Sequence, residues 1–329
     1  MREKILANGR ILATIALVVL YGVLVPLTSS TYQMSVMNLA MFYFVSALGL
    51  TVLQGMGGMM SMATFSIMGV SAFTTAQLSR NFGVHSLLSV IIAVMFTTVF
   101  SFALGAVLLR LSGSFFVFAT IGFSQIANNI FLNYKPLTGG PDGTSAIPKL
   151  NLGPLSPKNL YHWFFLMLFV SIVCGLLVEN IRRTHLGRAL ASVRDNEIAA
   201  KSLGINVYFT KLMAFTIAGA LAGLAGALIA HHNSFISFSL FLPAKNMMFV
   251  MMVMLGGVNS TLGAFVGALL VTSLPEWLRP LKEYLMLIYG FGVILLMVFM
   301  PTGMSGVVNS FIERARLRIA KAKEVDSNG

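Results

Sequence analysis

Residues 86–109 read Ser86-Leu-Leu-Ser-Val-Ile-Ile-Ala-Val-Met-Phe-Thr-Thr-Val-Phe-Ser-Phe-Ala-Leu-Gly-Ala-Val-Leu-Leu109, without one acidic or basic side chain. A helix of about 20 apolar residues crosses the hydrocarbon core of a bilayer, so this run is long enough to span a membrane. Composition agrees, because 57% of the 329 residues are hydrophobic and only 10% are charged. Similar runs occur at 11–27, 36–53, 57–78, 114–132, 160–180, 209–230 and 284–300. The sequence therefore predicts an all-α polytopic membrane protein.

The stretch 246–273 is longer than one span and shorter than two, and glycines interrupt its middle. Lys and Arg concentrate on the cytoplasmic side of membrane proteins. If this stretch crosses once, 12 of the 22 basic residues lie on the cytoplasmic side and 10 on the other side. If it enters and returns as a hairpin, 15 lie on the cytoplasmic side and 7 on the other. We therefore expect about eight full spans plus a broken or re-entrant helical hairpin.

This topology places both termini in the cytoplasm. The predicted transmembrane domain covers 1–310 and is followed by a basic cytoplasmic tail, 311–329. Loop 181–208 is then cytoplasmic, and loop 133–159 is extracytoplasmic.

A second glycine-interrupted segment, 55–73, is a counterpart of 246–273 in the other half of the chain. Paired interrupted segments in a transporter often lie beside the solute path. In the alternative interpretation the glycines serve only close helix packing, as at Gly219/Gly223 and Gly263/Gly267.

Groups that would carry chemistry are missing from the predicted spans. None of the ten acidic residues lies at mid-depth, and the five histidines lie at or beyond span ends. The sequence has no paired catalytic carboxylates and no glycine-rich phosphate loop followed by lysine. Its single cysteine, Cys174, excludes an intrachain disulfide. We predict no enzyme, no ATPase site of its own, no metal and no bound cofactor.

The cytoplasmic stretch 187–206 combines charge with helical propensity. Asp195 or Asn196 is a suitable N-cap for a helix beginning near Glu197, and Gly204 is suited to ending it. Such a short helix suits docking in a groove of a partner, although a solvated loop helix stays an alternative.

Four pieces of this sequence together resemble the branched-chain amino acid permease family of ABC importers. They are Glu197-x-Ala199-Ala200-x-x-x-Gly204, Leu137-Thr-Gly-Gly-Pro-Asp-Gly143, Gly256-Gly-Val-Asn-Ser-Thr-Leu-Gly263 with Gly267, and Met300-Pro-Thr-Gly-Met-Ser-Gly306. The first is similar to the coupling-helix motif of importers, with one residue inserted. The resemblance implies a type II-like importer permease in a bacterial plasma (inner) membrane, for branched-chain or related small amino acids.

The resemblance also implies partners: a second homologous permease subunit, two cytoplasmic ATPases that use ATP, and an extracytoplasmic solute-binding protein. The lipid bilayer is a further partner, and no nucleic acid is expected. Predicted contacts with the ATPases involve Arg188, Arg194, Asp195, Glu197, Ala199, Ala200 and Gly204. Predicted contacts with the binding protein involve Gly139, Gly140 and Asp142 of loop 133–159. In the alternative interpretation this loop is an ordinary connector without a partner.

The expected solute path combines two polar regions. Thr120, Ser124 and Asn128 recur at i, i+4 and i+8, so they share one helix face. Ser61, Thr64 and Gln125 join them, and the stretches around Thr64 and Gln125 depart from the family pattern by removing an ionisable group. Hydrogen bonding between helices, without solute contact, is the alternative role.

A different class of function stays open on sequence alone. An ion-coupled secondary transporter or channel for a small polar solute could bind sodium through carbonyls and hydroxyls. The missing mid-membrane charges argue only against a proton relay.

Overall fold

The computed structural model describes residues 30–153 and 156–278, with Gly22, Pro26 and nine positions between 283 and 295. The predicted span 11–27 lies almost entirely outside the described residues, and about half of the predicted span 284–300 lies outside them. The tail 311–329 and the stretch 300–306 also lie outside them.

Six helical stretches of the described chain are long and apolar enough to cross a membrane. The first is α2 (Thr31–Leu50), which continues as the π-helix η1 (Thr51–Met56). The next four are α4 (Ser86–Leu108), α5 (Ser114–Asn133), α7 (Leu160–Arg183) and α10 (Val207–Asn233). The sixth is Phe238–Gly256, which contains the 3-10 turns η4 (Phe238–Phe241) and η5 (Pro243–Lys245) and the helix α11 (Asn246–Gly256). The all-helical membrane architecture is thus confirmed, whereas the count of about eight full spans is not.

Shorter elements complete the bundle. Two of them, α3 (Thr64–Arg80) and α12 (Thr261–Trp277), are 17-residue helices. The connections contain α6 (Lys135–Thr138), η2 (Gly140–Asp142), α8 (His185–Asp195) and α9 (Glu197–Ser202).

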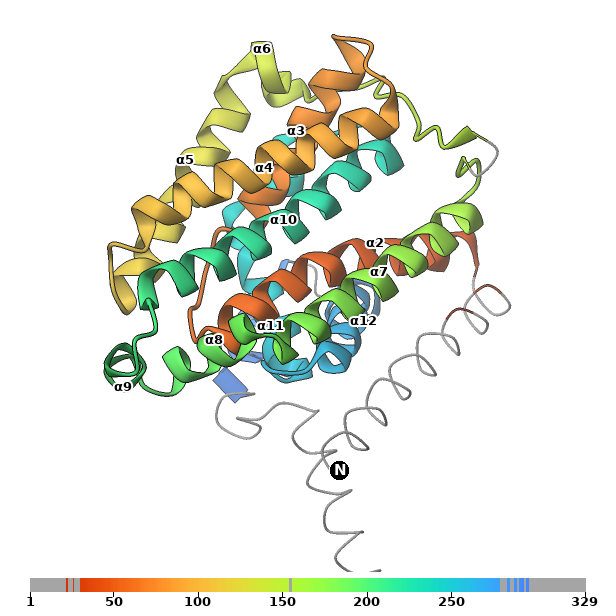
Figure 1. The fold of residues 1–329 in the computed structure, drawn as a ribbon. Helices are drawn as coiled ribbons and strands as arrows, with labels where there is room; N and C mark the ends of the chain where they lie inside the picture. The colour runs from red at the N-terminus through yellow and green to blue at the C-terminus, as the bar shows by residue number, and fades with distance from the viewer. Residues whose placement is uncertain are drawn as a thin grey trace, which may run out of the picture.

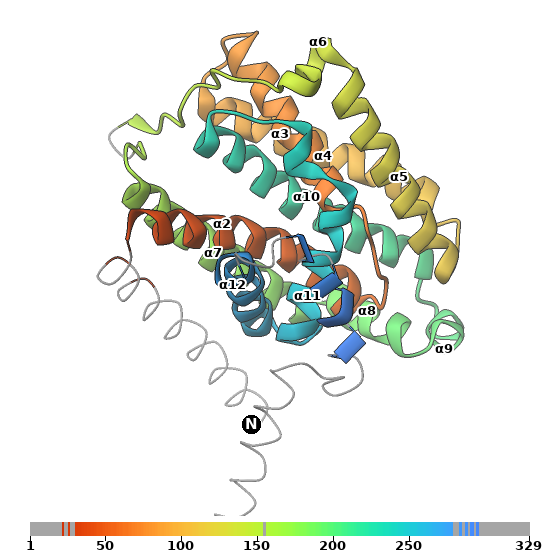
Figure 2. The ribbon, with the colours of Figure 1, turned by 180° about the vertical axis from the view of Figure 1, so that it is seen from behind.

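Helix α10 is the central element of the bundle. It packs against α3 and α4 on one side and against α2 on the other, as both views show (Figures 1 and 2). Helix α5 lies on the outer flank of α3 and α4, whereas α7 and the α11–α12 pair lie around α2. The two glycine-interrupted segments, 55–73 and 246–273, therefore belong to the same bundle.

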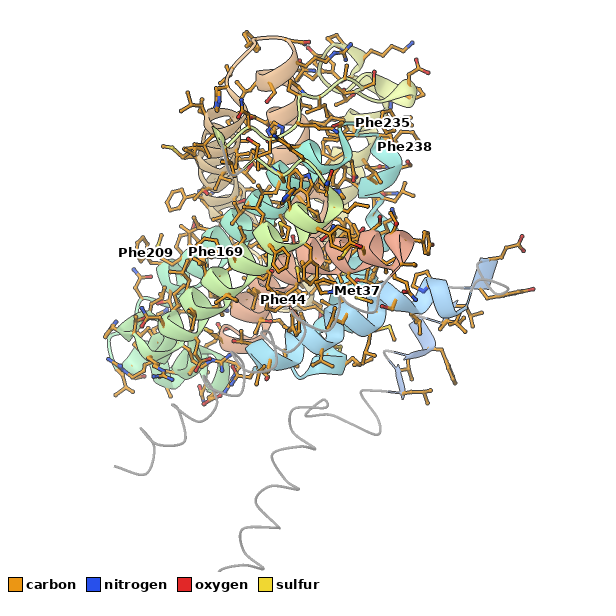
Figure 3. The ribbon with its side chains drawn as sticks, turned by 90° about the vertical axis from the view of Figure 1, so that its right-hand side faces the viewer. Met37, Phe44, Phe169, Phe209, Phe235 and Phe238 are labelled. Carbon is orange, nitrogen blue, oxygen red and sulfur yellow. The ribbon has the colours of Figure 1, made fainter. Side chains whose placement is uncertain are left out.

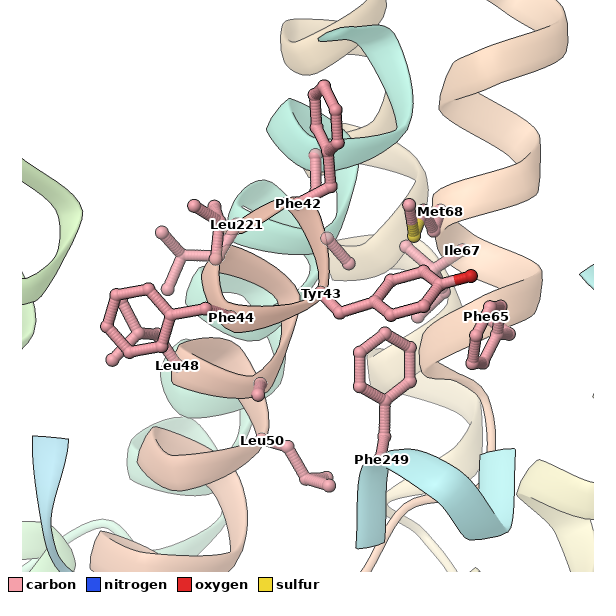
Figure 4. Packing of buried hydrophobic residues seen from close by; sticks show 14 of the residues in the cluster. Phe42, Tyr43, Phe44, Leu48, Leu50, Phe65, Ile67, Met68, Leu221 and Phe249 are labelled. Carbon is pink, nitrogen blue, oxygen red and sulfur yellow. The ribbon is translucent and has the colours of Figure 1, made fainter. Parts of the chain in front are cut away.

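The core is built from side chains of α2, α3, α10 and α11. Tyr43 of α2, Phe65 of α3 and Phe249 of α11 form a ring cluster whose centroids lie 4.4–5.6 Å apart (Figure 4). All three side chains are buried. Because such aromatic contacts add to the energy of area burial, this cluster holds the start of α3 against α2 and α11.

The outer surface of the described bundle is apolar along its spans. Phe169 of α7 is 66% exposed and Phe209 of α10 is 51% exposed (Figure 3). Large apolar side chains in contact with the surroundings are unfavourable in water and favourable in lipid, which agrees with membrane placement.

Small residues bring the helices close together. A side chain at Gly226 of α10 would collide with the backbone carbonyl of Met68 in α3, and one at Gly263 of α12 with the carbonyl of Gly256 in α11. Close helix packing is therefore an observed role of these two glycines.

We predict that Gly226→Ala destabilises the bundle by about 1–3 kcal/mol, because the backbone of α3 must move to admit the methyl group. Thermal unfolding of the detergent-solubilised protein measures the effect as a lower Tm. The matched control is Gly175→Ala in α7, where an added Cβ meets only Thr261 Cγ2 at an ordinary 3.5 Å. An unchanged Tm for Gly226→Ala would contradict this packing.

The interrupted segments differ in detail from the prediction. The helix expected over 57–78 begins only at Thr64, and 57–63 is a non-helical stretch after η1. Three glycines in 55–58 lower the conformational energy of this break, because they lack the Cβ that restricts the backbone of other residues. In 246–273 the helix breaks after Gly256, and Gly257 adopts φ +105°, so α11 and α12 form two short packed helices.

Candidate functional site

The stretch 187–206 folds as the sequence predicts. Asn196 caps α9: its Oδ1 accepts hydrogen bonds from the backbone N–H groups of Ile198 and Ala199, each at 3.0 Å. Gly204 adopts φ +82° just after the helix. A second helix, α8, precedes it, so α8 and α9 form an angular pair at one end of the bundle (Figure 1).

The outer surface of α9 carries apolar side chains. Ile198 is 80% exposed, and Leu203 just after the helix is 79% exposed. Glu197 forms an ion pair with Lys211, the fifth residue of α10, while Ala200 is buried. The pair therefore holds α9 to the next span and leaves Ile198 and Leu203 free to contact another surface.

Arg194 of α8 joins the loop to the interrupted segment of the first half. Its Nη1 donates a 2.8 Å hydrogen bond to the backbone carbonyl of Gly55 in η1, and its Nε and Nη2 donate to Asp195. A Cβ at Gly58, where φ is +67°, would lie 2.8 Å from Cγ of Arg194. The aliphatic part of the Arg194 side chain can pack against the backbone at position 58 only because that residue is glycine.

The same short segment touches the turn between α11 and α12. A side chain at Gly55 would collide with the carbonyl of Val258, which lies in that turn. Arg194, η1 and the turn therefore form one contact chain from the loop to both interrupted segments. The remaining predicted arginine, Arg188, instead donates to the carbonyl of Arg183 within its own loop region.

A buried polar cluster joins the starts of α3 and α11 to α5. Asn246 Oδ1 accepts a 3.0 Å hydrogen bond from the backbone N–H of Phe65, and its Nδ2 donates to Ser124 Oγ at 3.4 Å. Thr120 Oγ1 accepts from the backbone N–H of Met62 at 3.1 Å, and Ser124 Oγ donates to the carbonyl of Met62. These bonds satisfy the backbone that the break before α3 leaves without helical partners.

The predicted path residues divide into two groups. Thr120 and Ser124 are buried in the polar cluster, and Ser61 and Thr64 lie beside it in the interrupted segment. Gln125 does not join them: it lies on the exposed face of α5. Gln125 and the buried Ser124 therefore point to different sides of α5, because adjacent helical residues are rotated by about 100°. That these residues line a solute path stays a prediction.

Asn128 lies one turn beyond Ser124. Its side chain is partly buried, and its Oδ1 has no hydrogen-bond partner within the described residues.

The glycine-rich loop after α5 is compact. Gly139 and Gly140 adopt φ +73° and +64°, and Gly140 is buried, so both serve the turn itself. Asp142 is the exposed member of the predicted contact group. Thr144 pairs with Ile236 in an isolated β-bridge that fastens the loop to the segment after α10.

Sequence reasoning missed two buried residues. Asn246 is the first residue of the apolar stretch 246–273, so an amide at that boundary was the available signal. His231 lies inside α10, which runs three residues past the predicted span; its Nε2 contacts Ser89 Oγ at 3.0 Å and its Nδ1 the Pro148 carbonyl at 2.7 Å. In the part of the chain that the structure describes, no group of three His, Cys, Asp or Glu could hold a metal.

Comparison with known proteins identifies the family. The family described as "Branched-chain amino acid transport system / permease component" matches residues 32–301. The permease protein LivM of the high-affinity branched-chain amino acid transport system of Escherichia coli (strain K12) is 32% identical over 88% of this chain and 73% of its own. The autoinducer 2 import system permease protein LsrC of Enterobacter sp. (strain 638) is 26% identical over 83% and 80%. No solved structure matches. This chain therefore belongs to the family of permease components of branched-chain amino acid transport systems.

Proposed function

We propose that this chain is the membrane-spanning permease subunit of an ATP-driven ABC importer for branched-chain or related small amino acids. The observation that carries the proposal is the contact of Arg194 with Gly55, which ties the family-like loop 187–204 to an interrupted membrane segment. An importer permease needs such a connection, because ATP is hydrolysed in one subunit and the solute moves through another.

The coupling route runs in three steps. ATPase motion moves α9 through the exposed side chains of Ile198 and Leu203. The α8–α9 pair then moves η1 through Arg194. The segment 57–63 passes this displacement to the start of α3, where Asn246 joins it to α11.

The solute path lies along the exposed polar stripe of α5 in this proposal. Gln125 and Asn129 are exposed and lie one helical turn apart, with Gly122 on the same side of α5. A polar stripe facing lipid would be unfavourable, so the second permease subunit is expected to form the other wall. Thr120 and Ser124 act behind this wall by holding the broken start of α3.

Copurification tests the assembly. An affinity-tagged chain, extracted in mild detergent and analysed by mass spectrometry, should bring down a second permease and two copies of ATPase subunits. The binding protein should join when leucine is added. Recovery of the chain alone, or as a homo-oligomer without ATPases, would contradict the proposal.

The exposed side chain of Ile198 should be needed for ATPase attachment. We expect Ile198→Asp to weaken the contact by about 2 kcal/mol, or roughly thirtyfold, as loss of an apolar anchor at an interface does. Copurified ATPase measured by quantitative mass spectrometry checks this. Ile198→Leu, which keeps the apolar volume, should retain the ATPase, and equal retention by both variants would remove α9 from the interface.

The proposed orientation places Asp142 on the extracytoplasmic side and Ser202 in the cytoplasm. Because Cys174 is the sole cysteine and is buried, Cys174→Ala gives a clean background for single cysteines. A membrane-impermeant maleimide should label Asp142→Cys in intact cells and Ser202→Cys only after lysis. A reporter fused after Lys323 should share the side of Ser202, and the opposite result would overturn the hairpin topology.

A further inference from the structure

An apolar cleft of about 450 Å³ lies between α3, α4 and α5, away from the loop and the polar cluster described above. Six phenylalanines line it, together with aliphatic side chains and a polar edge made by Thr74, Gln77 and Thr138. The phenylalanines are Phe73, Phe82, Phe96, Phe100, Phe123 and Phe131. Such a lining offers few hydrogen bonds to a polar solute and suits a hydrocarbon.

The cleft exists because α5 touches the bundle along one narrow line. Its buried residues recur every three or four positions, at Phe116, Thr120, Ser124, Ala127 and Phe131. The neighbouring face of α5 is free to line the cleft, with Ile126 and Ile130 61% and 51% exposed. Both α4 and α5 are candidate membrane spans, so we expect lipid around this mouth, beside the side of α5 that carries Gln125 and Asn129.

One end of the cleft is closed by α6. Gln77 of α3 donates to the carbonyl of Leu137, and Leu137 and Thr138 line that end. Phe82, which is 75% exposed in the turn after α3, also lines the cleft.

Two basic side chains lie at the same end. Arg80 lies three residues after Gln77 and so faces the same side of α3, and Lys135 belongs to α6. Both are exposed, and neither takes part in an ion pair within the described residues. Positive charge above an apolar cleft complements a lipid with an anionic head group and a hydrocarbon chain.

We propose that this cleft binds one acyl chain of an anionic phospholipid from the leaflet on the α6 side, with the lipid phosphate beside Arg80 and Lys135. The acyl chain of the lipid enters between Phe96 and Ile126 and lies along α5. The site is separate from the coupling loop and the polar cluster. Its existence depends on membrane placement and does not depend on which solute is carried.

Fluorescence quenching tests the site in the intact complex, reconstituted in bilayers. Phe100→Trp places a reporter in the cleft, and Phe169→Trp places a matched reporter on the lipid-facing surface of α7 (Figure 3). The native residues Trp163 and Trp277 supply a background that the unsubstituted protein measures. Acyl-brominated phosphatidylglycerol is titrated against unlabelled phosphatidylcholine, with brominated phosphatidylcholine as the zwitterionic comparison.

The proposal predicts that brominated phosphatidylglycerol quenches the cleft reporter at a mole fraction about thirtyfold lower than the α7 reporter. Each of the two basic residues near the lipid head group contributes a preference of about fivefold. Brominated phosphatidylcholine should show no such difference. Arg80→Gln with Lys135→Gln should abolish the preference, whereas Lys149→Gln, an exposed lysine that does not line the cleft, should preserve it.

Filling the cleft provides an independent test. Val70→Phe should reduce quenching of the cleft reporter and leave the α7 reporter unchanged. Phe123→Trp serves as a second cleft reporter if Phe100→Trp does not assemble. Equal quenching at cleft and α7 would reduce the site to ordinary surrounding lipid, and absence of quenching at the cleft would mean that the second permease covers it. Either outcome overturns the proposal.

Discussion

Arg194→Leu is expected to reduce amino acid uptake about ten- to a hundredfold while the complex assembles and retains basal ATP hydrolysis. The variant removes the 2.8 Å charge-assisted hydrogen bond to the Gly55 carbonyl and keeps an apolar stem at the position. Such bonds contribute about 1.5–3 kcal/mol, so their loss shifts the equilibrium between coupled arrangements by about ten- to a hundredfold. Uptake should fall by that factor, because α8 no longer displaces η1.

Arg188→Leu is the matched control for this variant. Both arginines are exposed on α8, but Arg188 donates to the Arg183 carbonyl within the loop region and not to η1. Parallel measurements of leucine uptake and ATP hydrolysis should separate the two variants. Equal uptake by Arg194→Leu and the unsubstituted complex, at equal protein levels, would exclude this contact from the coupling route.

Asn246→Leu should have the second large effect. The leucine has a similar volume but cannot accept the 3.0 Å hydrogen bond from the N–H of Phe65 or donate to Ser124. Leaving a buried N–H without an acceptor costs about 1–3 kcal/mol. We expect a lower Tm and uptake reduced at least tenfold, because the start of α3 is no longer fixed to α11.

Asn246→Asp distinguishes fixation of α3 from other roles of this amide. Aspartate keeps the oxygen that accepts from Phe65 and loses the donor to Ser124. It should therefore restore part of the uptake lost in Asn246→Leu. If both variants transport normally, the polar cluster is not part of the mechanism.

The features that the sequence predicted well depend on local chemistry. The cap at Asn196 and the turn at Gly204 follow from residue types a few positions apart, and both are present. The apolar runs likewise identify membrane helices, because a span is defined by its own length and composition.

The features that were missed depend on contacts between distant segments. Helical spacing correctly grouped Thr120 with Ser124, but it could not show that another segment covers this face and leaves Gln125 exposed. The bond between Asn246 and Phe65 joins residues 181 positions apart, which no periodicity indicates. Hydropathy also included 57–63 in a span, since an apolar non-helical stretch has the same composition as a helix.

Leucine uptake by the purified complex tests the central claim most directly. Proteoliposomes that contain this chain, its partner permease and the ATPases should accumulate labelled leucine or a closely related amino acid. Accumulation should need trapped ATP and external binding protein, and it should survive ionophores that collapse sodium and proton gradients. Uptake by this chain without ATPases, driven by an ion gradient, would contradict the account and identify a secondary transporter.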